Sequence, residues 1–188
     1  MDKGLLSQRY ASSLFEVAHD NQVDKQVLDT MRHILWLHQH EPSFQQTLNV
    51  PVVLAREKMR LLQRVSPSDS WWLLERFFRI LIRNNRLSFL TRIARAYEDW
   101  YNMKYGIIDA VLTTVFPISF HFEGLMKRLI IHATKANQVE LATARNPELI
   151  GGFMLRFDSI QADASVKSEL SAIQRRMFDD PIDAKTNE

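Results

Sequence analysis

Glycine is distributed very unevenly along this chain. Residues 5–105 contain no glycine, and the five glycines of the sequence are Gly4, Gly106, Gly124, Gly151 and Gly152. Glycine-rich loops that hold phosphate groups use backbone conformations that other residues rarely adopt, so residues 5–105 cannot contain such a loop. A glycine-free segment of this length favours helices joined by short connections, and Gly106 marks its expected end.

The composition of the 188 residues excludes several classes of protein. Hydrophobic residues make up 46% of the chain and charged residues 24%, which is incompatible with intrinsic disorder. The absence of cysteine removes disulfides, thiolate metal sites, iron–sulfur clusters and cysteine nucleophiles. No apolar run approaches the roughly 20 residues that a membrane-spanning helix needs, and the first residues lack the apolar core of a signal peptide.

Apolar residues recur at helical spacing through residues 5–105. The first stripe has the spacing i, i+4, i+8, i+11, i+12 and consists of Leu6, Tyr10, Leu14, Val17 and Ala18. Further stripes fall within residues 27–38, 54–65, 71–83 and 90–101, whereas residues 43–48 are expected to form a short turn. The pattern and the short connections predict an antiparallel bundle of about six helices over residues 1–105.

The segment 71–83 is apolar around most of its circumference. Only Glu75, Arg76, Arg79 and Arg83 form a narrow polar edge. Such a helix is either central to a bundle or covered on a second side by a partner protein. The pattern alone favours neither alternative.

The residues after Gly106 follow a mixed pattern. β-Branched residues over 107–116 predict a strand, and Ser119 is expected to cap the helix that follows. Further along we expect a strand at 139–143, a hairpin of 152–157 with 160–163, and a closing helix at 166–177. Residues 106–178 therefore predict a small α+β domain with a polar tail at 179–188, so the fold class of the chain is α+β.

The sequence offers no constellation of residues for catalysis. Gly151-Gly152 is not followed by the lysine and hydroxyl residue of a phosphate loop, and no G-x-S-x-G or H-E-x-x-H sequence occurs. His38 and His40 lie two positions apart, so on a helix they would point about 160° away from each other. We expect no catalytic residue, no cofactor and no metal ion.

Charge differs between the two predicted regions. Residues 1–106 carry 15 basic and 11 acidic side chains, whereas residues 107–188 carry 9 and 11, which suggests different partners. The basic residues between Arg56 and Arg95, near Trp71 and Trp72, leave a nucleic-acid-binding protein as an alternative function. The helical pattern around the tryptophans favours a core position for them, so we expect no nucleic-acid partner.

Several short motifs resemble one family, the delta subunit of F-type ATP synthases and its mitochondrial counterpart, the oligomycin-sensitivity-conferring protein. The most specific stretch is residues 146–153, Asn-Pro-Glu-Leu-Ile-Gly-Gly-Phe, and the resemblance extends from Leu5 to Met177. The other matching residues are Arg9-Tyr10-Ala11, Leu14-Phe15, Asn84, Arg86, Leu87, Gly106, Thr113, Pro117, Arg156, Asp163, Ser165, Val166 and Leu170. Three usual glycines of the family are replaced here, by Asn85, Asp158 and Ala164.

The resemblance implies a non-catalytic stator part of a proton-translocating ATP synthase. In this family the N-terminal helical domain binds the N-terminal helices of the alpha subunits. The C-terminal domain holds the C-terminal region of the peripheral-stalk b subunits. The absence of a transit peptide favours a bacterial protein, peripheral to the cell membrane on its cytoplasmic side. We expect the first and fifth helices to form the partner groove, with Tyr10, Ala11, Leu14, Leu74, Phe78 and Leu81 as its candidate residues.

Overall fold

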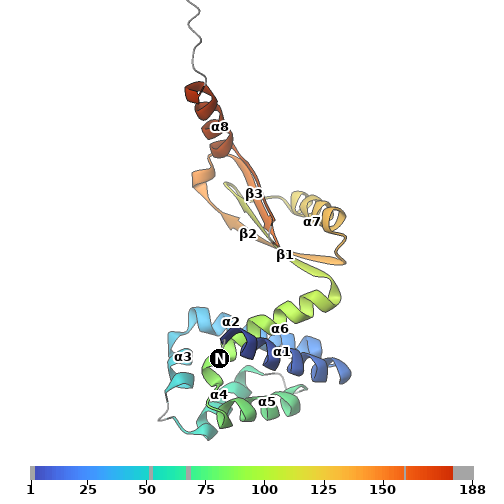
Figure 1. The fold of residues 1–188 in the computed structure, drawn as a ribbon, viewed down its shortest axis with the longest axis vertical. Coiled ribbons are helices and arrows are strands. Elements are labelled where there is room, and N and C mark those ends of the chain that lie inside the picture. The colour runs from blue at the N-terminus through green and yellow to red at the C-terminus, as the bar shows by residue number, and fades with distance from the viewer. Residues whose placement is uncertain (1–2, 51–52, 67–68, 159, 180–188) are drawn as a thin grey trace, which may run out of the picture. The chain divides into compact units, whose positions relative to one another are not determined.

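The chain divides into two units, Met1–Tyr105 and Gly106–Glu188. The computed structural model describes residues 3–50, 53–66, 69–158 and 160–179 (Figure 1). Most of the tail expected at 179–188 therefore lies outside the described residues. Among the described helices, none has the length and apolar character needed to cross a lipid bilayer.

The first unit is helical, as the periodicity predicts. Its six α-helices and one short 3-10 helix are α1 (Lys3–Asp20), α2 (Asp24–His40), α3 (Pro42–Asn49), α4 (Ala55–Val65), α5 (Trp71–Arg83), η1 (Leu87–Phe89) and α6 (Leu90–Tyr105). The expected turn at 43–48 is wrong, because those residues form α3. Pro42 at the start of α3 has a backbone torsion suited to a first helical turn, and Leu48 is buried in the core. Burial stabilises a helix that is too short to form by itself.

The core of the helical unit is built around α6, which packs along both α1 and α2. On α6, Ile93 and Tyr97 are fully buried, and they meet Phe78 of α5 and Met31 of α2 in one apolar cluster. The nearly all-apolar α5 is not the central helix, because Ile80 on its outer side is 49% exposed.

The helices of the bundle do not all alternate in direction. α2 and α6 run antiparallel: Arg32 forms an ion pair with Glu98 (Nε to Oε1, 2.7 Å), whereas Asp24, which lies earlier on α2, accepts a hydrogen bond from Tyr105, which lies later on α6. α1 and α6 run in the same direction, because Phe15 contacts Tyr97 at one level and His19 lies beside Tyr105 further along. The prediction of an antiparallel bundle is therefore correct for α2 and α6 but wrong for α1 and α6. Apolar stripes specify which faces meet and leave the direction of a helix open.

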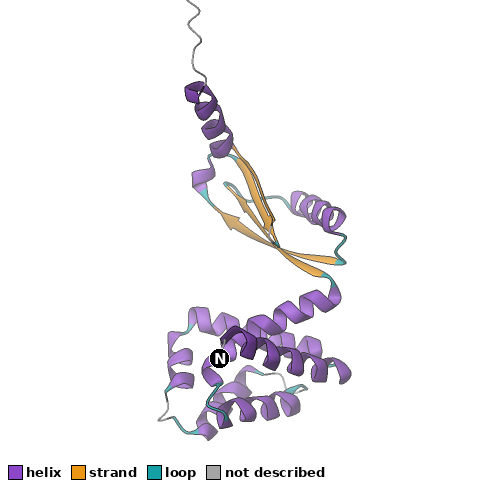
Figure 2. Ribbon diagram, in the orientation of Figure 1, coloured by secondary structure: helices purple, strands orange, loops and turns teal. Residues whose placement is uncertain are grey.

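The second unit is a four-stranded mixed sheet with helices. Its elements are β1 (Ile107–Thr114), α7 (Phe120–Thr134), β2 (Gln138–Arg145), η2 (Pro147–Leu149), β3 (Gly152–Phe157), β4 (Ile160–Ser165) and α8 (Val166–Asp179). The strand order is β2-β1-β3-β4, with β1 parallel to β2 and the other pairs antiparallel. Figure 2 distinguishes the strands of this sheet from the helices by colour. The parallel pair is joined through α7, as such pairs require a crossover. The two units together confirm the α+β class.

One face of the sheet packs against α7. Leu112 of β1 and Ile130 of α7 are both almost fully buried, and Phe122 meets Phe153 edge-on with ring centroids 6.1 Å apart. The predicted cap of α7 is confirmed, because the Ser119 hydroxyl accepts a hydrogen bond from the Phe122 backbone N–H at 3.2 Å.

The turns explain the unusual residues in the family motifs. Asn85 and Asp158, which replace usual glycines, have φ angles of 52° and 51°, a region that asparagine and aspartate tolerate better than most residues. Gly152 has a φ of 74°, and a Cβ atom there would lie 2.1 Å from the Ala164 carbonyl oxygen. Two backbones thus approach each other closely at Gly152, which leaves no room for a side chain there.

Candidate partner-binding groove

A groove lies between α1 and α5 on the helical unit, with a cavity volume of about 520 Å³. Two helices contribute most of its wall, and the turn after α5 adds one residue. The lining residues are Leu6, Arg9, Tyr10, Ser13, Leu14, Val17, Leu73, Arg76, Phe77, Ile80 and Arg86.

The floor of the groove is apolar. The rings of Tyr10 and Phe77 meet edge-on with centroids 6.3 Å apart, which joins the two helices at this level. Val17 is 44% exposed and Ile80 is 49% exposed. Apolar side chains that remain exposed along a groove are typical of surfaces that receive an amphipathic helix.

The position of Tyr10 is set by the turn after α5. Its hydroxyl accepts hydrogen bonds from Arg86 (Nη1, 2.8 Å) and from Asn84 (Nδ2, 3.3 Å). The Arg86 guanidinium also lies over the Tyr10 ring, 5.7 Å from its centroid. Residues more than seventy positions apart in the sequence therefore hold one aromatic ring against the groove floor.

Only two of the six candidate partner-binding residues line this groove, namely Tyr10 and Leu14. Ala11, Leu74, Phe78 and Leu81 have no exposed surface and belong to the core cluster, so they do not line this groove. Because α5 is apolar on two sides, its periodicity cannot distinguish the side that faces the core from the side that faces the groove.

Sequence reasoning missed three groove residues on α5, namely Leu73, Phe77 and Ile80. Leu73 and Ile80 lie beside Arg76 at one border of the polar edge. A binding surface must adjoin solvent in the free protein, so apolar residues that border the polar edge are better candidates than those opposite it. The same rule would have excluded Leu81, which lies opposite the polar edge, but it does not separate Leu74 from Phe77, because these two lie equally far from that edge.

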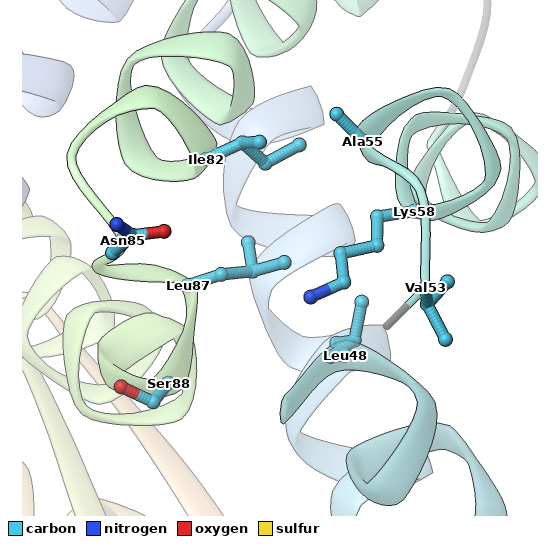
Figure 3. Close-up of a pocket in the computed structure, with 8 residues that line it drawn as sticks. All are labelled: Leu48, Val53, Ala55, Lys58, Ile82, Asn85, Leu87 and Ser88. Carbon is cyan, nitrogen blue, oxygen red and sulfur yellow. The ribbon is translucent and has the colours of Figure 1, made fainter. Parts of the chain in front are cut away.

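A second cavity, of about 510 Å³, lies elsewhere on the helical unit (Figure 3). Its lining residues are Leu48, Val53, Ala55, Lys58, Ile82, Asn85, Leu87 and Ser88. The Lys58 side chain points into this cavity (Figure 3). Its lining contains no carboxylate or imidazole among the described residues, so it offers no acid–base pair for catalysis. No cluster of potential metal ligands occurs in the described part of either unit.

The last helix of the sheet unit has an exposed apolar stripe. It consists of Val166, Leu170, Ile173 and Met177, whose exposed fractions range from 38% to 75%. Their spacing of four, three and four residues is the repeat of a coiled-coil seam. Among the described residues α8 packs mainly on β4 and η2, and its first residue donates a backbone hydrogen bond to Gly151, so this stripe is a second candidate partner surface.

The comparison with known proteins extends over nearly the whole chain. Residues 6–177 match the family model of the ATP synthase delta (OSCP) subunit. The ATP synthase subunit delta of Azobacteroides pseudotrichonymphae is 31% identical, and the match covers 93% of this chain and 98% of the relative's chain. The ATP synthase subunit delta of Bacteroides thetaiotaomicron is 26% identical, and the match covers 95% of this chain and 97% of the relative's chain.

The fold also matches a solved structure. A chain in the cryo-EM structure of the Toxoplasma gondii mitochondrial ATP synthase hexamer superposes with a TM-score of 0.69 and 20% identity, covering 94% of this chain and 99% of that one. The comparisons give no support to the nucleic-acid alternative. With a family match over residues 6–177, this chain belongs to the ATP synthase delta (OSCP) subunit family.

Proposed function

We propose that this protein is a non-catalytic stator subunit of a bacterial, proton-translocating F-type ATP synthase. Its helical unit binds the N-terminal helices of the alpha subunits, and its sheet unit holds the C-terminal region of the b subunits. It acts at the cytoplasmic side of the cell membrane, peripheral to the bilayer. By keeping the catalytic head from turning with the rotor, it allows rotation to drive ATP synthesis.

The observation that carries the proposal is the groove between α1 and α5. It combines an apolar floor at Tyr10 and Phe77 with exposed apolar residues along its sides, and its open shape suits one amphipathic helix. The alpha-subunit helix expected from the family is a partner of that kind.

A stator must resist torque, so its contacts have to dissociate slowly. Differences in affinity between related complexes arise mostly from the dissociation rate, and well-packed apolar anchors govern that rate. Exposed ion pairs contribute only up to about 1 kcal/mol each. An apolar groove therefore suits the proposed mechanical role better than a surface held by exposed charges alone.

The stripe on α8 supports the second half of the proposal. A helix from the b subunits could pack along Leu170 and Ile173 in the manner of a coiled coil, because the three-four spacing keeps the stripe facing a partner helix. The two partners would then bind at separate units of the chain.

The test of the head contact measures binding of the alpha-subunit N-terminal peptide to the full-length protein by calorimetry. We expect binding at micromolar concentration or tighter, and at least a tenfold loss, about 1.4 kcal/mol, in the variant Ile80→Asp. The matched control is Leu54→Asp, since Leu54 is 67% exposed and does not line the groove. Absence of binding by the unaltered protein at micromolar concentration would overturn this half of the proposal.

The stalk contact is tested by pull-down of the b subunits from solubilised membranes. The double variant Leu170→Asp, Ile173→Asp should fail to retain them, while the control Phe120→Asp, at a residue that is 90% exposed on α7, should retain them. Equal retention by all three proteins would show that the α8 stripe is not the stalk surface.

A further inference from the structure

The polar residues of the α1/α5 groove carry charges of one sign. Its lining includes Arg9, Arg76 and Arg86, together with the uncharged Ser13, and among the described residues it contains no aspartate or glutamate. Arg86 contacts the floor directly, since it donates a hydrogen bond to the Tyr10 hydroxyl, and Arg9 and Arg76 belong to the two helices that form the sides of the groove. Three arginines therefore line the apolar groove.

These guanidinium groups have no acidic partner within the described part of the chain. Arg76 lies over the Trp72 ring at 5.9 Å, and Arg86 donates to Tyr10. The nearby carboxylate of Glu75 already forms an ion pair with Arg79, 2.6 Å away, and Arg79 does not line the groove. The free groove thus has an uncompensated positive rim.

A positive rim around an apolar floor discriminates between amphipathic helices. Carboxylates beside the apolar face of an incoming helix would meet the rim favourably, whereas lysine or arginine at the same places would be repelled. Opposite charges also steer the encounter and raise the association rate, an effect that salt weakens. The apolar floor then makes dissociation slow, and the positive rim selects helices that carry acidic residues.

We infer that Arg9 and Arg76 are specificity-determining residues that make the groove select an amphipathic helix with acidic residues along both sides of its apolar face. The inference rests on the proposed function, because it describes the helix that the groove receives. It adds a requirement that the apolar surface alone does not impose, namely carboxylates in the alpha-subunit segment. Arg86 has a different role, because it also positions Tyr10, so it is left unchanged in the test.

The experiment compares two peptides on the full-length protein. One is the alpha-subunit N-terminal peptide, and the other is the same peptide with each Asp and Glu replaced by Asn and Gln. Calorimetry at about 50 mM and about 500 mM salt spans weak and strong screening. We expect the acidic peptide to bind about tenfold more tightly at low salt, with the difference mostly lost at high salt.

The protein variants Arg9→Gln and Arg76→Gln show whether the rim is the cause. Each variant should bind the acidic peptide about threefold or more weakly than the unaltered protein does, and should bind the neutral peptide with unchanged affinity. This is the pattern that coupled charges give in a double-mutant cycle. Arg92→Gln, at an exposed arginine of α6 outside the groove, is the control and should change neither peptide.

The outcomes separate the inference from the proposed function. Equal binding of both peptides at both salt concentrations, or an alpha-subunit segment without carboxylates, would overturn the inference and leave the groove as the head contact. Failure of both peptides to bind would overturn the proposed function itself. The acidic peptide could also bind more tightly than the neutral one by a margin that Arg9→Gln and Arg76→Gln leave unchanged. That result would assign the selection to other residues and would also overturn the inference.

Discussion

The hydroxyl of Tyr105, the last residue of α6, donates a hydrogen bond to the carboxylate of Asp24, the first residue of α2. The same aspartate lies 3.2 Å from Nδ1 of His19 on α1, and its backbone carbonyl oxygen accepts a hydrogen bond from the Tyr97 hydroxyl at 3.0 Å. Three helices are thus tied together at Asp24, at the end of the helical unit where the chain passes to Gly106.

Replacing Asp24 by Asn should destabilise the helical unit at neutral pH. Burial raises the pKa of the Asp24 carboxyl, but the hydrogen bonds from Tyr105, His19 and the Lys25 backbone N–H outweigh burial, so the pKa lies below its usual value. We expect the free energy of unfolding to fall by about 1–3 kcal/mol, because the amide of Asn cannot accept all the hydrogen bonds that the Asp24 carboxylate accepts.

The pH dependence of that loss has a definite sign. Since the pKa is lower in the folded state, the carboxylate stabilises the fold above about pH 4 and loses this effect as the pH falls through the folded-state pKa. Urea unfolding followed by tryptophan fluorescence reports on this unit, because the four tryptophans all lie within residues 1–105. Asp29→Asn, at an exposed residue of the same helix, is the control, and an equal loss in both variants would contradict the prediction.

At alkaline pH the tyrosines of the same cluster should weaken the fold. The hydrogen bond to Asp24, followed by burial, raises the pKa of Tyr105 to about 12, and burial followed by the Asp24 charge raises the pKa of Tyr97 still further. Groups with raised folded-state pKa values stabilise the fold below about pH 10, and this stabilisation falls as the pH rises through the folded-state values.

The variant Tyr105→Phe separates this effect from general alkaline unfolding. It should show a shallower decline of the unfolding free energy between about pH 10 and pH 12 than the unaltered protein. In that range the Tyr105 hydroxyl ionises in the unfolded state but stays protonated in the folded state, and the variant lacks this difference. The measurement is urea unfolding at a series of pH values. Parallel declines in the two proteins would show that Tyr105 does not contribute.

Two glycine substitutions in the second unit should have opposite effects. Gly152→Ala places a Cβ atom 2.1 Å from a backbone oxygen at a φ of 74°, so we expect a loss of more than about 2 kcal/mol. Gly124→Ala lies within α7, where the nearest atom is 3.8 Å away, and should stabilise by about 0.5–1 kcal/mol. Hydrogen exchange of the β3 and β4 amides measures both, and unchanged exchange in Gly152→Ala would contradict the geometry.

Truncation at two positions of α5 should separate its core side from its groove side. Leu74 has no exposed surface, so Leu74→Ala should cost about 2–5 kcal/mol of unfolding free energy. Ile80 is half-exposed and lines the groove, so Ile80→Ala should cost less than about 1 kcal/mol and weaken binding of the alpha-subunit peptide. Comparable stability losses in the two variants would contradict the assignment of these faces.

Some errors of sequence-based prediction have an evident physical origin. The helix α3 is too short for propensity to favour it, and it forms because Leu48 is buried against the rest of the unit. The shared direction of α1 and α6 depends on the path of the intervening chain, which apolar periodicity does not encode. The cluster at Asp24 joins residues 81 positions apart, and no local pattern brings them together.

By itself the sequence determined the class of fold, the family and the places of most helices and strands. These follow from local information: the period of apolar residues, the turn residues at Asn85 and Asp158, and the glycine pair at the start of β3. Only the tertiary structure decided which side of α5 faces the core and which faces the groove, and that Arg9, Arg76 and Arg86 line one apolar groove. A helix that is apolar on two sides fits either orientation, and the packing of the whole unit selects one of them.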